Sequence, residues 1–159
     1  MLLLVLLASA CMQSTSGDLA ANNSAAEEAP AISDEQIVTV YKPPTWGCCG
    51  AWTEHLAEAG YVVDVINIDD LTDIKAEHQV PHELQGCHTA IVDGYIIEGH
   101  VPADEIHRLL TEKPDMAGLA VPGMPIGSPG MEMGTTVEPF QVIAFDKDGN
   151  VEVFASYPR

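Results

Sequence analysis

The segment from residue 36 to residue 69 most constrains the fold, because it reads as a strand, a loop with cysteines, a helix and a second strand. The β-branched run IVTVY ends at a pair of prolines, which is typical of a strand followed by a loop. The run AWTEHLAEAG then places Trp52 and Leu56 on one helical face and ends at Gly60. The run YVVDVINID follows as a second strand. Two strands joined through a helix predict a parallel pair with a right-handed crossover.

The next part of the chain predicts two more strands and another helix. A short helix is expected from Leu71 to Glu77, and the run CHTAIVDGYIIEG forms two apolar strands with a hairpin turn at Asp93-Gly94. The run ADEIHRLLTE follows Pro102 and carries an apolar helical stripe that ends before Pro114. This βαβ then ββα order is the order of the thioredoxin and glutaredoxin folds, so we predict an α/β, thioredoxin-like domain.

The C-terminal part adds a long loop and a hairpin. Residues 115–139 are rich in Gly, Pro and Met and show no periodicity. This segment is longer than a loop that only connects two elements of a compact domain. We therefore expect this Gly/Pro/Met loop to be functional. The run QVIAFDKDGNVEVFASY closes the chain as a β-hairpin that turns at Asp148-Gly149.

The N-terminal residues predict export. Residues 1–11 form an apolar run that is too short to span a bilayer and ends in small residues before Cys11. The string ASAC is similar to the lipobox of bacterial lipoproteins, so we expect Cys11 to be the site of lipidation. The leucine of the lipobox stands one place too early here, and no Lys or Arg precedes Lys42, whereas a signal peptide begins with positive charge. Residues 12–35 have the composition of a flexible tether, and residues 36–159 form the folded domain. The expected location is the periplasm, either free or anchored to the membrane as a lipoprotein.

The charge of the chain limits its partners. The formal net charge is -18, from 24 acidic residues against 6 lysines and arginines. This charge repels the phosphates of nucleic acid and the headgroups of anionic membranes, so nucleic-acid binding is excluded. An acidic surface suits the attraction of cations, and a plain solvated surface is the alternative explanation.

The cysteines are the main candidates for chemistry. Adjacent cysteines such as Cys48 and Cys49 rarely pair with each other, because a vicinal disulfide strains the peptide between them. At a helix N-terminus we expect their pKa values to be lowered, and two thiolates suit a soft metal ion. Cys87 is expected to face the first loop and complete a site of three thiolates. A disulfide from Cys87 to Cys48 or Cys49 is the alternative.

Methionines and histidines supply further candidate ligands. Met124 and Met131 lie in the Gly/Pro/Met loop, where their thioethers are expected at the surface, and thioethers select copper(I). His100 follows the end of an expected strand, and we expect it to approach the site. His88 is as consistent with pointing away from the site as toward it, because its neighbour Cys87 is expected to point toward the site and successive side chains of a strand alternate. The chain has no C-x-x-C pair, which argues against a zinc site of regular spacing.

Three strings carry a resemblance to a known family. YKPPTWGCCGAW, ELQGCHTAIVDGYIIEGHVPADEI and GLAVPGMPIGSPGME resemble the CopG-type periplasmic copper-resistance proteins, over residues 37–132. The resemblance implies a thioredoxin-like fold that holds a cysteine-bridged, multinuclear copper cluster, in proteins encoded alongside copper-export systems.

The resemblance also assigns residues. It matches Cys48, Cys49 and Cys87 to the family's cysteines, and Met124 and Met131 to its methionines. The family usually reads C-G-C-C in the first loop, but Trp46 stands here in place of the first cysteine. We therefore expect fewer copper ions than in the family, or a substitute ligand from His88, His100 or a methionine.

Two functions follow from the sequence. The first is an exported copper(I)-binding protein for copper resistance or handling, whose partners are copper ions and copper-export or copper-chaperone proteins. The alternative is an enzyme, a thiol-disulfide or copper oxidoreductase, in which one cysteine of the pair attacks and Cys87 resolves. The C-C spacing argues against this enzyme, because a C-x-x-C pair closes a disulfide without strain and an adjacent pair does not.

Overall fold

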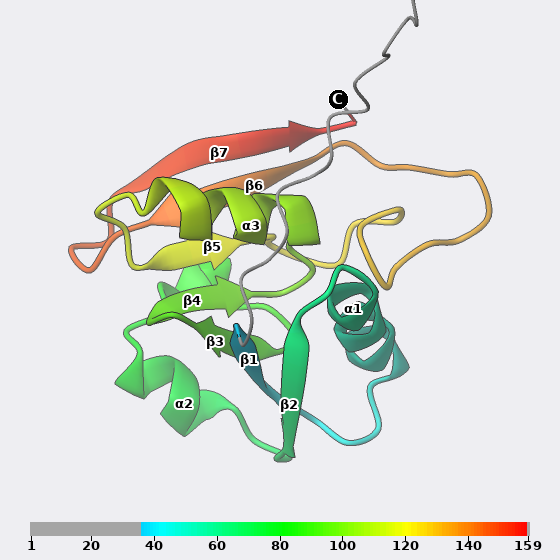
Figure 1. Cartoon of the computed structure of the whole chain (residues 1–159), viewed down its shortest axis with the longest axis horizontal. Coiled ribbons are helices and arrows are strands. Elements are labelled where there is room, and N and C mark those ends of the chain that lie inside the picture. The colour runs from blue at the N-terminus through cyan, green and yellow to red at the C-terminus, as the bar shows by residue number, and fades with distance from the viewer. Residues whose placement is uncertain (1–35, 159) are drawn as a thin grey trace, which may run out of the picture. The chain divides into compact units, whose positions relative to one another are not determined.

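The computed structural model describes residues 36–158 of the 159-residue chain. The expected signal peptide, the lipidation site Cys11 and the tether at 12–35 lie outside the described residues. Within residues 36–158, no helix combines the length and apolarity needed to cross a membrane. The fold of the described part is a mixed α/β arrangement built on one seven-stranded sheet (Figure 1).

The first three elements form the expected parallel unit. Strand β1 (Ile37–Lys42) leads into helix α1 (Gly47–Glu58), which returns the chain to strand β2 (Val62–Asn67). Ile37 pairs with Val62 and Lys42 with Asn67, in parallel register. Helix α1 begins four residues earlier than the sequence predicts, so the cysteine pair belongs to its first turn instead of to a preceding loop.

The second group of elements contains the expected hairpin and helix. After α2 (Thr72–Glu77) and a 3-10 helix (His82–Leu84), strands β3 (Thr89–Val92) and β4 (Tyr95–Glu98) pair antiparallel. Their turn residues Asp93 and Gly94 have φ values of 47° and 83°, as a tight hairpin requires. Helix α3 (Ala103–Glu112) follows Pro102, its N-cap residue.

The prediction of a continuous loop over residues 115–139 is wrong in one part, because Gly118–Ala120 form a strand, β5. This strand is parallel to β4, and a Cβ at Gly118 would lie 1.9 Å from the carbonyl oxygen of Ile96. Only glycine permits this approach of the two backbones. Strands β6 (Phe140–Phe145) and β7 (Val151–Tyr157) form the expected C-terminal hairpin on β5, and the sheet order is β2-β1-β3-β4-β5-β6-β7.

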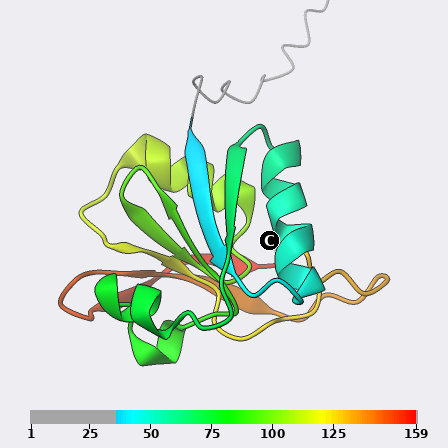
Figure 2. The ribbon, with the colours of Figure 1, turned by 90° about the horizontal axis from the view of Figure 1, so that it is seen from below.

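Helices cover both faces of the sheet. On one face the side chains of α1 and α3 bury an apolar core that includes Trp52, Leu56, Ile106 and Leu109. Figure 2 shows α1 running beside β1 and β2. On the other face a smaller apolar cluster, which includes Leu84 and Phe145, lies on the same side as α2. The first turn of α1 therefore lies near the ends of the central strands, where the candidate site is found.

Candidate metal centre

The first turn of α1 carries two of the cysteines. Cys49, Trp52 and Leu56 are the buried residues of this helix, whereas Cys48 is half-buried. Trp46 is the N-cap residue and supplies no side-chain hydrogen bond, and the first turn contains no acidic residue. The unpaired N–H groups of this turn therefore favour anionic ligands such as thiolates.

Cys87 and His100 approach the helix from the sheet. Cys87 lies just before β3 and His100 lies two residues after β4. Glycines allow the two segments to touch, because a Cβ at Gly86 would lie 2.6 Å from the backbone nitrogen of Gly99. The backbone nitrogen of Gly99 also donates to the carbonyl of His88, at 3.3 Å. This contact places the residues that follow the two glycines side by side.

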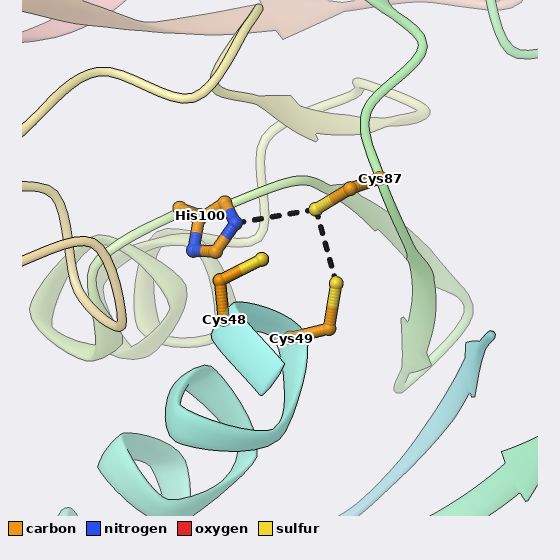
Figure 3. A group of neighbouring side chains, drawn as sticks. All are labelled: Cys48, Cys49, Cys87 and His100. Carbon is orange, nitrogen blue, oxygen red and sulfur yellow. Dashed lines mark hydrogen bonds between the residues drawn. The ribbon is translucent and has the colours of Figure 1, made fainter. Parts of the chain in front are cut away.

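Four side chains converge at this point (Figure 3). The sulfur atoms of Cys48, Cys49 and Cys87 and a ring nitrogen of His100 all lie within 4.8 Å of one another. The Sγ of Cys87 is 3.2 Å from the Sγ of Cys49 and 3.2 Å from Nε2 of His100. Cys49, Cys87 and His100 are buried. Three soft sulfur donors and one imidazole nitrogen at this separation form a metal-binding arrangement.

The backbone of the Gly/Pro/Met loop orients His100. Its Nδ1 lies 2.7 Å from the carbonyl oxygen of Pro129, which has no proton to give, so Nδ1 donates in this hydrogen bond. The proton is therefore on Nδ1, and the lone pair of Nε2 faces Cys87. Histidine ligands in metal sites are commonly held in this way through their second nitrogen.

His88 lies behind the cysteines and is not one of the four converging residues. Its Nδ1 is 3.3 Å from the Sγ of Cys87, and its ring lies 4.2 Å from the ring of Trp52 between centroids. Burial is the main factor that lowers the pKa of His88 well below its ordinary value, with the nearby His100 acting in the same direction. A neutral His88 with its proton on Nδ1 donates to Cys87.

The thiols differ from the sequence prediction in their pKa values. Burial and the neighbouring Cys49 raise the pKa of Cys48. The hydrogen bond to Cys87, together with burial, raises the pKa of Cys49. The expected lowering at the helix N-terminus is therefore wrong for this arrangement, because burial and the proximity of other thiols outweigh the helix end.

The Gly/Pro/Met loop lies directly against the site. A Cβ at Gly130 would lie 2.7 Å from the carbonyl oxygen of Cys48 and 2.7 Å from the backbone nitrogen of Trp52, so this loop packs on the first turn of α1. Met131 follows Gly130 and is half-buried, whereas Met124 and Met133 are 48% and 64% exposed. Met131 is therefore the loop methionine that directly follows the residue packed on the cysteine turn.

The backbone contributes to the site in ways that the sequence does not predict. The carbonyl of Pro129 and the close contacts of Gly86 and Gly130 have no side-chain signal, and only the repeated Gly-Pro pattern of the loop hinted at them. His78 and His82 have the four-residue separation of a zinc-binding pair, but they do not belong to the converging group.

Comparisons with known proteins show the family to which this chain belongs. A family model described as "Protein of unknown function, DUF411" matches residues 84–131, which contain Cys87, His100 and Met131. A solved structure titled "Copper resistance protein copG- Form 2" is 39% identical and has a TM-score of 0.75. It covers 79% of this chain and is itself covered completely. The chain belongs to the CopG copper-resistance family.

A second solved structure supports the same assignment. The structure titled "Copper resistance protein copG- Form 1" is 40% identical with a TM-score of 0.74, and the match covers 79% of this chain and 100% of that one. No curated protein matches the chain. The resemblance to the CopG family that three sequence strings indicated is therefore confirmed.

Proposed function

We propose that this CopG-family chain binds copper(I) outside the cytoplasm and acts in copper resistance or handling. The observation that carries the proposal is the convergence of three cysteine sulfurs and the Nε2 of His100 within 4.8 Å. Thiolates select copper(I) among the common metal ions, and the neighbouring structures are titled copper resistance proteins.

Each site residue receives a role in this proposal. Cys48, Cys49, Cys87 and His100 bind copper directly, with the proton of His100 held on Nδ1 by Pro129. His88 donates to the Cys87 sulfur and stays outside the ligand set, because its Nδ1 is 3.3 Å from that sulfur while its ring packs on Trp52. A donor to a ligating sulfur orients it and tunes its charge.

The methionines act at the entrance to the site. Met124 is largely exposed, and Met131 follows the glycine that packs on the cysteine turn. Thioethers bind copper(I) without releasing a proton, so the loop offers weak first contacts before the ion reaches the thiolates. The ligand set supports at least one copper ion, and Trp46 in place of the family's outer cysteine limits the size of a multinuclear cluster.

Zinc is the competing metal for this ligand set. Three cysteines and one histidine are also a common structural zinc site. We favour copper(I) for two reasons. Exposed methionine thioethers accompany the cysteine thiolates, and both solved relatives are named copper resistance proteins. A metal competition experiment must therefore accompany any measurement of copper binding.

The fold and location complete the proposal. We assign the β1–α1–β2 unit and the β3–β4–α3 unit to a thioredoxin-like arrangement, with β5, β6 and β7 added beyond β4. The N-terminal residues then direct export, and Cys11 carries a lipid that anchors the domain to the membrane near copper-export or copper-chaperone partners.

Metal retention tests the proposed function. The purified full-length chain is loaded anaerobically with copper(I), desalted in the presence of excess zinc, and assayed for both metals. We expect at least one copper ion per chain and little zinc. The double variant Cys48→Ala/Cys49→Ala should lose the copper, because it removes two of the four donors.

The remaining cysteine of the chain provides the control. We assign Cys11, which precedes the described residues 36–158, to lipidation and not to copper binding, so Cys11→Ala should retain copper as the wild type does. Equal copper retention by the double variant and the wild type would refute the assignment of the site. Preferential retention of zinc would refute the assignment of the metal.

A further inference from the structure

A buried polar network lies beside the metal centre and has no place in the proposed ligand set. Lys75 of α2 and Glu98 of β4 are 6% and 0% exposed, and the lysine Nζ lies 2.7 Å from Oε2 of the glutamate. Thr89 of β3 donates its hydroxyl to Oε1 of Glu98 and accepts from Lys75 at 2.9 Å. One carboxylate thus connects α2, β3 and β4.

The same carboxylate also binds the backbone next to a ligand. The backbone nitrogen of Gly86 donates to Oε2 of Glu98 at 2.8 Å, and Gly86 immediately precedes Cys87. Cys87 lies outside regular secondary structure, so no strand hydrogen bonds fix the backbone just before it. The Glu98 carboxylate therefore supplies an anchor that the sheet does not.

Glu98 is also connected to the second ligand from the sheet, His100, through the backbone. It is the last residue of β4, two positions before His100. Its carbonyl oxygen accepts from the backbone nitrogen of Val121 at 3.0 Å, which ties in the start of the loop whose Pro129 orients His100. The side chain and backbone of one residue thus hold both segments that contribute ligands from the sheet.

Stability alone is a weak explanation for this network. Burying an ion pair costs desolvation energy, and apolar side chains of similar volume often serve stability as well or better. A carboxylate with three donors instead fixes the relative position of the groups that it joins. Of the ion pairs among the described residues, only this one has both side chains less than a tenth exposed.

We infer that Glu98, supported by Lys75 and Thr89, is a positioning residue for the metal centre. Glu98 holds Cys87 and His100 at the separation that the metal requires. This inference rests on the proposed copper function. Glu98 does not touch the metal; it acts through the N–H of Gly86 and through the backbone that leads to His100. Length and acceptor geometry at position 98 matter for this role, and the negative charge does not.

Two variants separate the effect of the position of the Glu98 acceptor oxygen from the effect of its negative charge. Lys75→Met/Glu98→Gln removes both charges but keeps a side chain of the same length and an oxygen for Gly86. Glu98→Asp keeps the charge but shortens the side chain by one methylene, so the carboxylate no longer reaches Gly86. The apparent copper(I) Kd of each full-length variant is measured by competition with a copper(I)-selective chelator, beside the free energy of unfolding.

The expected order is specific to a positioning role. The double variant should bind copper within about threefold of the wild type, and Glu98→Asp should bind about tenfold more weakly, in the range found for residues that orient metal ligands. X-ray absorption of the copper-loaded Glu98→Asp variant should show a smaller nitrogen contribution from His100. Ile106→Val, in the α3 core, provides a control for loss of stability without loss of copper affinity.

The outcomes distinguish this inference from the proposed function. Failure of the wild type to bind copper would refute the proposed function. A wild type that binds copper, together with a folded Glu98→Asp variant of unchanged Kd and unchanged nitrogen contribution, would refute only the positioning role. Copper affinity that simply follows unfolding free energy across all variants, Ile106→Val included, would also refute it. The Glu98→Asp variant is decisive even where the double variant does not fold.

Discussion

The Sγ atoms of Cys49 and Cys87 lie 3.2 Å apart although 38 residues separate them in the chain. One sulfur belongs to the first turn of a helix and the other to a segment that leads into a central strand. The contact exists because α1 packs on the sheet through Trp52, whose indole nitrogen donates to the carbonyl of Val101 at 2.8 Å. The metal centre is therefore fixed by the packing of α1 on the sheet, and its properties should respond to changes in that packing.

The contact of the Gly/Pro/Met loop with α1 gives the first prediction. Gly130→Ala should weaken copper(I) binding by about tenfold, because the new Cβ would meet Cys48 and Trp52 at 2.7 Å and push the loop away. His100 then loses the carbonyl of Pro129 that orients it. Copper Kd by chelator competition checks this result. Gly123→Ala is the control, since Gly123 also has positive φ but no atom within 4 Å of its added Cβ.

Trp46 gives a second prediction, which concerns the number of copper ions. Trp46→Cys restores the C-G-C-C pattern of the family at the exposed N-cap of α1. A fourth thiolate next to the pair should raise the copper-to-protein ratio above that of the wild type after anaerobic loading. Trp46→Ser serves as the control for loss of the indole. An unchanged ratio in Trp46→Cys would show that the outer cysteine does not determine copper content in this chain.

Gly118 gives a prediction for stability. Gly118→Ala should lower the free energy of unfolding by about 3 kcal/mol, because its Cβ would lie 1.9 Å from the carbonyl of Ile96 and separate β5 from β4. Denaturant unfolding followed by circular dichroism measures the change. Gly50→Ala, in helix α1 with no atom near the added Cβ, should instead be neutral or stabilise the fold by about 0.5 kcal/mol. Similar losses in the two variants would contradict the close approach at Gly118.

Tyr61 gives a prediction for alkaline pH. Burial and the nearby Asp104 raise the pKa of this tyrosine from 10.0 to about 12. The unfolded chain therefore loses this proton first, and Tyr61 contributes stability that is complete below pH 10 and is lost as pH rises toward 12. Unfolding free energy should fall by about 2 kcal/mol more in the wild type than in Tyr61→Phe between pH 8 and pH 11.5.

The variant itself isolates this effect. All other tyrosines and the lysines titrate in both proteins, so their contributions cancel in the difference. At pH 8 Tyr61→Phe should be as stable as the wild type or more stable, because it removes a buried hydroxyl that has no hydrogen-bond partner among the described residues. Parallel stability curves up to pH 11.5 would mean that the hydroxyl ionises as easily in the folded state as in the unfolded chain.

Local patterns predicted most of the fold. The alternation of β1 and the apolar stripe of α3 were sufficient to place those elements, and Asp93-Gly94 identified the central hairpin. The three residues of β5 carry no readable period, and their strand forms only because β4 and β6 lie on either side. The start of α1 was also misplaced, because the glycines around the cysteine pair resemble a loop.

The candidate site was predictable to the extent that side-chain chemistry marks it. Cysteine is rare in this chain, so Cys48, Cys49 and Cys87 stood out, and the structure brings them together with His100. The orientation of His100 depends on a backbone carbonyl, and the direction of the thiol pKa shifts depends on burial. Neither property has a local sequence signal. The assignment of all these residues as copper ligands remains a prediction.

Copper K-edge X-ray absorption of the anaerobically loaded full-length chain, combined with the copper-to-protein ratio, tests whether the three cysteines and His100 bind copper(I). We expect at least one copper(I) per chain, coordinated mainly by sulfur, with one nitrogen contribution that disappears in His100→Ala. A copper-loaded chain whose first shell contains only oxygen and nitrogen, or whose spectrum is unchanged in the Cys48→Ala/Cys49→Ala variant, would contradict it.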